Sequence, residues 1–204
     1  MNRIIARLIK KANKLTEEQE KFIQECKESR KFNNDQMEEI RKGFEYRLTM
    51  EQVKLYADPK FDYNQMNLIR FGFEDSLTME QVKLYANPNF DDNQMYQIKE
   101  GFENELTMEQ VKLYADTKFD YKQMKEMREG FKHGLTIDQV KIYADTKFDN
   151  NQMEEIREGF ENGLTIDQVK FYADPKYNWR EMYHIKECFE DGMTIEEVKE
   201  KFEL

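Results

Sequence analysis

The acidic residues that recur along the chain are the first candidates for chemistry, because carboxylates can hold metal ions and transfer protons. An aspartate opens the same short segment four times, at Asp62, Asp91, Asp120 and Asp149. The stretch 58–65 resembles a calcium-binding loop in outline, but it lacks the required glycine and has Ile69 where a bidentate glutamate belongs. We therefore exclude calcium and assign these aspartates to helix capping.

Other catalytic constellations are absent from the sequence. His133 and His184 stand in different segments without a neighbouring cysteine, so neither zinc binding nor histidine-assisted nucleophilic catalysis has a ligand or residue set to use. Serine occurs only at 29 and 76, and no glycine-rich phosphate loop is present. We predict a protein that is not an enzyme and uses no cofactor and no metal.

Two ladders of basic residues follow the chain. One consists of Lys54, Lys83, Lys112, Lys141, Lys170 and Lys199, and the other of Arg41, Arg70, Lys99, Arg128, Arg157 and Lys186. Such ladders could track a polyanion. Because many glutamates and aspartates lie nearby, we expect solvated ion pairs instead.

The charge of the chain is uneven. Residues 1–14 carry five basic residues and no acid, so the remainder of a chain whose net charge is −10 carries −15. An acidic body repels phosphate, which disfavours direct nucleic-acid binding. Aromatic residues make up 13% of the chain, which argues against disorder.

The setting predicted from the sequence is cytoplasmic. Cys26 and Cys188 lie far apart and give no disulfide framework, which favours a reducing compartment. No stretch approaches 18 apolar residues, so no membrane span is expected. The basic N-terminus lacks the apolar core and cleavage site of a signal peptide.

The elements that must position any site form a repeat of 29 residues. Leu-Thr recurs at 48–49, 77–78, 106–107, 135–136 and 164–165, and Met193-Thr194 follows at the same step. The predicted units are 32–60, 61–89, 90–118, 119–147, 148–176 and 177–204, which together form a domain over 32–204. The last unit has Lys201 where the other five have tyrosine, which we interpret as a terminal cap.

Each unit contains two helix-start signals. Asp62 and Gln65 form a capping-box pattern that predicts a first helix to about Glu74. Thr78 and Gln81 repeat the pattern and predict a second helix of about eight or nine residues. Glycines such as those at 134, 163 and 192 suit the left-handed position after a helix. Helices this short depend on packing between neighbouring units.

Residues 1–31 are predicted to form a degenerate N-terminal helical cap, with a capping box at Thr16 and a helix to about Arg30. Ahead of it, an apolar stripe of isoleucine and leucine over 4–9 faces a basic side, which could instead touch anionic lipid or nucleic acid. The fold class predicted is an all-α solenoid, right- or left-handed, of six two-helix repeats with this degenerate capping unit.

One set of positions on the first helix is not explained by capping or packing alone. Three sets of positions, those of residues 63, 67 and 71 and their equivalents, differ most among the units and lie one helical turn apart along the first helix. The set at 39, 68, 97, 126, 155 and 184 also varies. The predicted partner-binding residues are Tyr63, Asn67, Phe71, Tyr96, Tyr121, Lys125, Trp179 and Tyr183. A solvent face could simply drift, but drift favours small polar residues, and exposed tyrosine and tryptophan are typical interface anchors.

The repeat Lys-Phe-Asp-x-x-Gln-Met-x-x-Ile-Arg-x-Gly-Phe-Glu-x-Gly-Leu-Thr-x-x-Gln-Val-Lys-x-Tyr-Ala resembles a short two-helix tandem repeat of bacterial proteins, often of phages or mobile elements, over about 32–204. The resemblance implies a host-interaction role such as countering a defence system, and it implies no functional residues. The function predicted is a non-catalytic protein-protein interaction solenoid whose partner is another protein. The alternatives are an acidic nucleic-acid mimic that inhibits a DNA- or RNA-acting defence enzyme, and a module that binds a small molecule or nucleotide.

Overall fold

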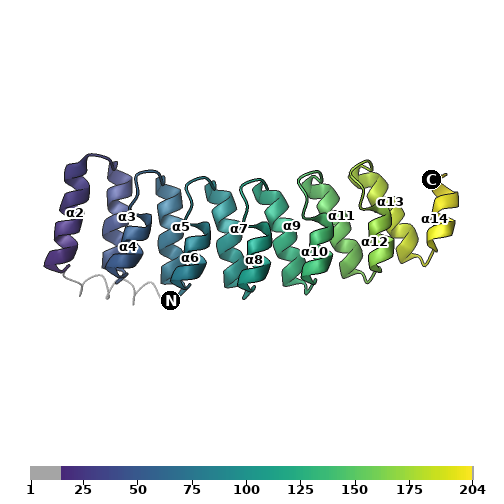
Figure 1. Cartoon of the computed structure of the whole chain (residues 1–204), viewed down its shortest axis with the longest axis horizontal. Coiled ribbons are helices and arrows are strands. Elements are labelled where there is room, and N and C mark those ends of the chain that lie inside the picture. The colour runs from purple at the N-terminus through teal and green to yellow at the C-terminus, as the bar shows by residue number, and fades with distance from the viewer. Residues whose placement is uncertain (1–14, 204) are drawn as a thin grey trace, which may run out of the picture. The chain divides into compact units, whose positions relative to one another are not determined.

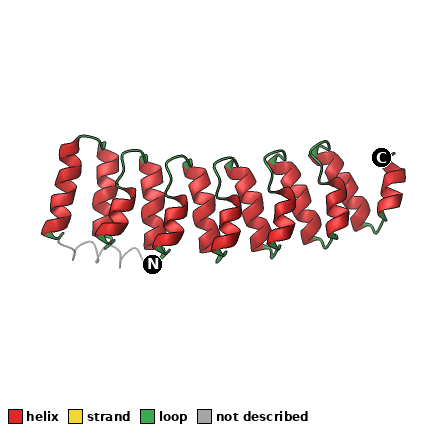
Figure 2. Cartoon of the chain, in the orientation of Figure 1, coloured by secondary structure: helices red, strands yellow, loops and turns green. Residues whose placement is uncertain are grey.

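The computed structural model describes residues 15–203, and within that range the chain is helical with no strand (Figures 1 and 2). The prediction of an all-α fold is confirmed for these residues. The chain divides into two compact units, one ending at Glu103 and the other beginning at Asn104. The apolar and basic stripe predicted within residues 1–14 lies outside the described residues.

The helices repeat at the predicted step. Twelve-residue first helices are α3 (Asn34–Glu45), α5 (Tyr63–Glu74), α7 (Asp92–Glu103), α9 (Tyr121–Lys132), α11 (Asn150–Glu161) and α13 (Trp179–Glu190). The shorter second helices are α4 (Met50–Tyr56), α6 (Met79–Tyr85), α8 (Met108–Tyr114), α10 (Ile137–Tyr143), α12 (Ile166–Tyr172) and α14 (Ile195–Phe202). The leading helix is α2 (Glu17–Ser29), and no helix in the described part is both long and apolar enough to cross a bilayer.

Neighbouring helices pack in layers within each unit. In the first unit α2 packs on α3, α3 on α5 and α5 on α7, while α4 and α6 each fill the space between two first helices. The second unit repeats this arrangement with α9, α11 and α13 in one layer and α10 and α12 against them. Figure 1 shows the first helices side by side within each unit.

Capping boxes begin these helices, as predicted. At α5 the side chain of Asp62 accepts from the backbone N–H of Gln65, and the Gln65 side chain accepts from the N–H of Asp62, each at 2.9 Å. Thr78 and Gln81 form the same box at α6. The recurrent aspartates therefore satisfy backbone donors that would otherwise lack partners.

The second helices end earlier than expected. Five of them have seven residues, because the chain leaves the helix at the alanine before Asp-Pro, Asn-Pro or Asp-Thr. After the first helices, Gly134, Gly163 and Gly192 take the predicted positive φ angles of 87° to 90°. Ser76 occupies the equivalent position with φ 70°, a conformation that costs a residue with a side chain more than it costs glycine.

A glutamine in each of four first helices links its own helix to the next repeat. The Gln36 carboxamide oxygen accepts from the N–H of Asn33 at 2.8 Å, and its nitrogen donates to the carbonyl oxygen of Phe61 at 2.6 Å. The same donation joins Gln65 to Phe90, Gln123 to Phe148 and Gln152 to Tyr177 at 2.6 to 2.7 Å. In the last repeat Glu181 keeps the capping half of this arrangement.

Tyrosine packs on glycine inside the hairpins. Tyr85 is fully buried, and its hydroxyl donates to the carbonyl oxygen of Leu68 at 3.4 Å. A Cβ atom added at Gly72 would lie 1.8 Å from that hydroxyl oxygen, so no larger residue fits there without moving the tyrosine. The same contact joins Gly43 to Tyr56.

The last hairpin replaces both members of this pair. Cys188 stands at the glycine position and Lys201 at the tyrosine position, and the Lys201 nitrogen lies 3.1 Å from the Cys188 sulfur. The cysteine in the first helix is larger than glycine, and the lysine in the second helix is narrower than tyrosine and leaves room for it. The interpretation of Lys201 as a terminal cap stays a prediction.

The first prediction concerns the linking glutamine. Gln65→Glu keeps the capping acceptor but loses the donor to Phe90 and places a carboxylate against a carbonyl oxygen. We expect it to lower the free energy of unfolding by about 2 to 3 kcal/mol. Thr78→Ala removes a cap that serves one helix only and should cost about 1 kcal/mol. Urea denaturation followed by circular dichroism measures both, and equal costs would contradict the linking role.

The second prediction tests the tyrosine–glycine contact. Gly72→Ala should lower stability by about 1 to 3 kcal/mol through overpacking, despite the roughly 1 kcal/mol advantage of alanine in a helix. Tyr85→Phe removes the clashing oxygen, and the next atoms are then 3.2 and 3.4 Å from the added carbon. The double variant should therefore be more stable than the sum of the two single losses predicts. If the stability losses of the two single variants add up to that of the double variant in the same denaturation assay, the contact between residue 72 and the Tyr85 hydroxyl does not determine the cost.

Candidate partner-binding surface

The surface selected from the sequence follows the first helices. We call the exposed side chains at the positions of Tyr63, Asn67 and Phe71, with their equivalents in the other repeats, the aromatic stripe. Its six aromatic members, Tyr63, Phe71, Tyr96, Tyr121, Trp179 and Tyr183, are 38 to 46% exposed. Their predicted exposure is confirmed, and their role in binding stays a prediction.

The two polar members of the predicted site differ in their surroundings. Asn67 is half-buried, and its amide nitrogen donates to a carboxylate oxygen of Glu39 at 3.2 Å. Lys125 is exposed, with its nitrogen 3.7 Å from a carboxylate oxygen of Glu126. The Asn67 side chain is therefore held by a buried carboxylate, whereas the Lys125 side chain is exposed and can change rotamer.

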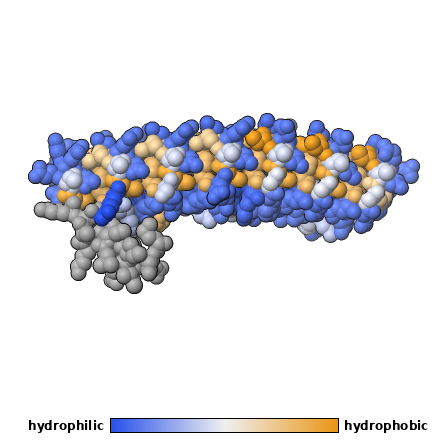
Figure 3. Space-filling view, turned by 90° about the horizontal axis from the view of Figure 1, so that it is seen from below, coloured by the Kyte–Doolittle hydropathy of each residue, from blue (hydrophilic) through white to orange (hydrophobic). Residues whose placement is uncertain are grey.

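Tyr46 and Ile166 are further exposed apolar side chains that the sequence analysis did not select. Tyr46 is the C-cap residue of α3, so it lies outside the helix positions whose spacing of four predicted the stripe. Ile166 opens a second helix and is 44% exposed. Figure 3 shows hydrophobic residues that gather between hydrophilic margins on the surface turned to the viewer.

The expected solvated ion pairs are wrong for one of the two basic ladders. Its members after Arg41, which are Arg70, Lys99, Arg128, Arg157 and Lys186, are all buried to 8% exposure or less. The variable acidic position at Glu39, Glu126 and Glu155 is buried beside them. The other ladder, from Lys54 to Lys199, is exposed as expected.

Several of these buried cations pair with a carboxylate of the preceding repeat as well as with one on their own helix. The Arg70 Nε lies 2.8 Å from a carboxylate oxygen of Glu39, one repeat earlier, and Arg70 also pairs with Glu74. Arg157 pairs with Glu126 at 3.0 Å and with Glu161 at 2.7 Å. A buried cation needs such partners because desolvation of an unpaired charge is costly.

The carboxylate that pairs with a cation of the next repeat is missing at position 68. Leucine stands there in place of a carboxylate, and Lys99 pairs instead with Asp75 at 2.9 Å and with Glu103. Lys186 keeps the usual arrangement, at 2.7 Å from Glu155. Lys186 also pairs with Glu158, whose equivalent for Lys99 is Phe71, so the two cations differ in both carboxylate partners from the preceding repeat.

Two ladder cations and Lys42 also lie over aromatic side chains. The guanidinium of Arg70 lies 4.4 Å from the ring centre of Phe71 and 5.4 Å from that of Tyr46. Lys42 lies over Tyr63 at 5.8 Å, and Lys186 lies over Tyr183 at 5.4 Å. These cation–π contacts fix ring orientation at the surface.

The pKa values of two buried carboxylates beside the ladder are shifted in opposite directions. Burial raises the pKa of Glu39, but hydrogen bonds from Lys42 and Arg70 outweigh it and hold the pKa below its ordinary 4.5. Burial raises the pKa of Glu155, and the bond from Lys186 does not offset it. Glu39 has two cationic partners, whereas Glu155 shares its one cation with another carboxylate. This difference explains the opposite pKa shifts.

No group of three histidine, cysteine, aspartate or glutamate residues lies close enough to hold a metal ion in the part of the chain that the structure describes. Comparisons with protein-family models, curated proteins and solved structures gave no match. The resemblance to a phage or mobile-element repeat therefore stays a prediction, and the surface is interpreted from its own residues.

The third prediction concerns Glu39. Glu39→Gln should lower the free energy of unfolding at pH 7 by about 2 to 3 kcal/mol, because Arg70 and Lys42 lose a buried counter-charge. The folded-state pKa of Glu39 is lowered, so its stabilisation is present above the ordinary value and is lost as the pH falls through the folded-state value. The cost of the substitution should therefore shrink on acidification below about pH 4.5.

Glu155→Gln is the matched control at the equivalent position. The folded-state pKa of Glu155 is raised, so acidification stabilises the unmodified chain relative to this variant. Urea denaturation between neutral and acidic pH should give opposite slopes for the two substitutions. Parallel slopes would contradict the assigned pairings.

Proposed function

We propose that this chain is a non-catalytic, cytoplasmic α-solenoid of six two-helix repeats that binds another protein through the aromatic stripe. The observation that carries the proposal is the exposure of six aromatic side chains, 38 to 46% each, at equivalent positions of the first helices. Aromatic residues are enriched at the centres of protein interfaces, where each buries a large apolar area.

Support also comes from how the stripe is held before any partner binds. The Trp179 ring lies 5.1 Å from the Arg180 guanidinium, and the Tyr183 hydroxyl donates to Glu187 at 2.6 Å. Side chains that are already ordered lose less rotamer entropy on binding. Trp179 and Tyr183 lie one turn apart on α13 and are proposed to act together as an anchor.

The kind of partner is proposed from the repeat alone. The resemblance to repeats of phages and mobile elements favours a host protein, and a component of a defence system is the specific candidate. Direct binding to nucleic acid is disfavoured by the charge of −15 that residues 15–204 carry.

A second candidate function has its own observation. The stripe in the second unit carries Glu154, Glu158 and Glu187, whose side chains are 39 to 47% exposed. A row of exposed carboxylates could present charge as nucleic-acid phosphates do and occupy a DNA- or RNA-acting enzyme. The alternative is therefore an acidic nucleic-acid mimic.

The fourth prediction tests the anchor. Replacing Trp179 and Tyr183 together with alanine should leave helical content unchanged, since both side chains lie outside the buried core. Affinity for a partner captured from host lysate should fall by roughly 2 to 4 kcal/mol. Quantitative affinity capture, followed by calorimetry with the purified partner, measures the loss.

Ile166→Ala is the matched control, because it removes an equally exposed apolar side chain outside the stripe. It should retain the partner. Retention by the Trp179 and Tyr183 double variant would refute the aromatic anchor. Capture that survives the aromatic substitutions but disappears with added salt would favour the acidic mimic, because salt screens exposed charges.

A further inference from the structure

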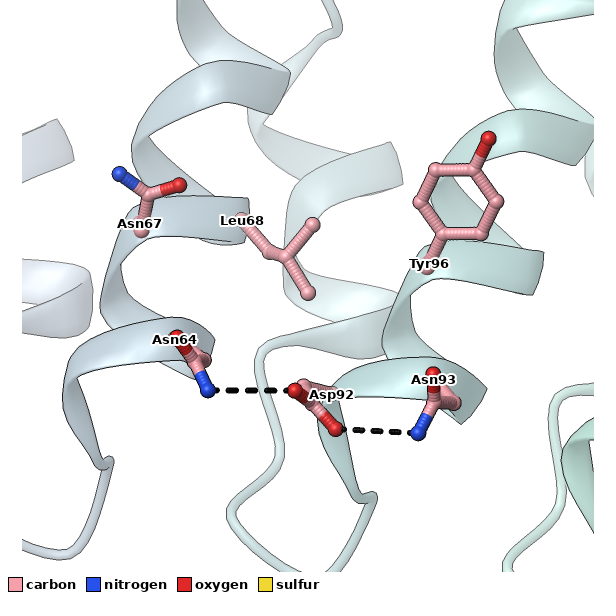
Figure 4. A pocket seen from close by; sticks show the side chains of 6 residues that line it. All are labelled: Asn64, Asn67, Leu68, Asp92, Asn93 and Tyr96. Atoms are coloured by element: carbon pink, nitrogen blue, oxygen red, sulfur yellow. Dashed lines mark hydrogen bonds between the residues drawn. The ribbon is translucent and has the colours of Figure 1, made fainter.

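The aromatic stripe of the first unit is hollowed between α5 and α7. A pocket of about 250 Å³ is lined by Asn64, Asn67, Leu68, Asp92, Asn93 and Tyr96, and Figure 4 shows these side chains. The volume is below the roughly 300 to 1,000 Å³ that is usual for small-molecule sites. It suits a single side chain of a partner better than a whole cofactor.

Asp92 provides the charge of this pocket. Its two carboxylate oxygens accept from the amide nitrogens of Asn64 at 3.2 Å and Asn93 at 3.3 Å. No lysine or arginine pairs with Asp92 among residues 15–203. Each carboxylate oxygen can accept a second hydrogen bond, so the group is oriented but retains acceptor capacity.

Tyr96 provides the apolar wall, and it lies one turn after Asp92 on α7. It is the most exposed aromatic side chain of the stripe, at 46%. At the equivalent Tyr183, Lys186 lies over the ring at 5.4 Å. No cation of the described residues lies over Tyr96, and the equivalent Lys99 is paired with Asp75 and Glu103.

Lys99 has Leu68 and Phe71 where Lys186 has its partners Glu155 and Glu158. Among the described residues, the pocket therefore holds a carboxylate without a paired lysine or arginine and an aromatic face without an overlying cation. Both groups are complementary to one positively charged, planar ligand. Arginine combines that charge with a flat surface and a fork of donors.

We propose that this pocket binds an arginine side chain from a basic segment of the partner protein. The guanidinium stacks on Tyr96 and donates to Asp92, while the amides of Asn64, Asn67 and Asn93 pair with the peptide groups beside the arginine. The charge of −15 on residues 15–204 favours approach of a basic segment. This inference rests on the proposed protein-binding role of the stripe and adds the chemistry of its partner.

The fifth prediction is tested by nuclear magnetic resonance titration of the full-length chain. The probe is the blocked tripeptide Gly-Arg-Gly, compared with a peptide in which citrulline replaces arginine and with free arginine amide. We expect saturable shifts of the side-chain amide signals of Asn64 and Asn93 with the arginine peptide. Citrulline keeps the shape but not the charge and should bind at least fivefold more weakly.

Variants locate the site. Asp92→Asn and Tyr96→Ala should each weaken the arginine peptide by about fivefold to tenfold. Asp35→Asn removes an exposed acid from the first turn of α3, and Tyr46→Ala removes an exposed aromatic side chain outside the stripe; both should bind as the unmodified chain does. If these control variants weaken binding of the arginine peptide equally, the effect depends on general charge or aromatic content, and the proposed site is overturned.

Two further outcomes would overturn the proposal. Equal binding of arginine and citrulline peptides would exclude a charge-selective site. Free arginine amide that binds as tightly as the peptide would identify a small-molecule guanidinium site. Failure here, with partner capture still dependent on Trp179 and Tyr183, would leave the protein-binding function intact. Loss of that dependence, with the arginine site confirmed, would remove the proposed anchor alone.

Discussion

The glutamine that closes the capping boxes of α3, α5, α9 and α11 is the interaction on which the rest of the structure depends. A single carboxamide satisfies an N–H at the start of its own helix and a carbonyl oxygen just before the next first helix, as Gln36 does between Asn33 and Phe61. Because helices of seven and twelve residues are not stable alone, each repeat needs its neighbour. The glutamine fixes that neighbour at one distance and one orientation.

Regular spacing then allows charge to be buried between repeats. Arg70 lies out of water beside Glu39 of the previous repeat and Glu74 of its own helix, and Arg157 pairs with Glu126 and Glu161 in the same way. Such pairs add specificity of register more than net stability, since desolvation offsets much of their attraction. They also hold the rings of the aromatic stripe, which ties the surface to the interior.

Variation inside the ladder gives the repeats different surfaces. Lys99 has Leu68 and Phe71 in place of the carboxylates that pair with Lys186, and no cation of the described residues lies over Tyr96. Lys186, in contrast, lies over the Tyr183 ring. Substitutions in one repeat can thereby alter the surface chemistry of the next. A repeat protein can diversify its binding surface in this way without changing its hairpins.

The sequence by itself determined the period and the helix starts, because capping is local. Asp62, Thr78 and Gly134 each act within a few residues of their own position, and each was assigned from the sequence. It also identified the exposed stripe, since spacing of four places side chains on one side of a helix. It did not find that Arg70 and its equivalents are buried, or that Leu68, Asp92 and Tyr96 share a pocket. Those facts depend on which residues of adjacent repeats face each other, and only tertiary packing decides that, because no local preference links residues 24 to 31 positions apart.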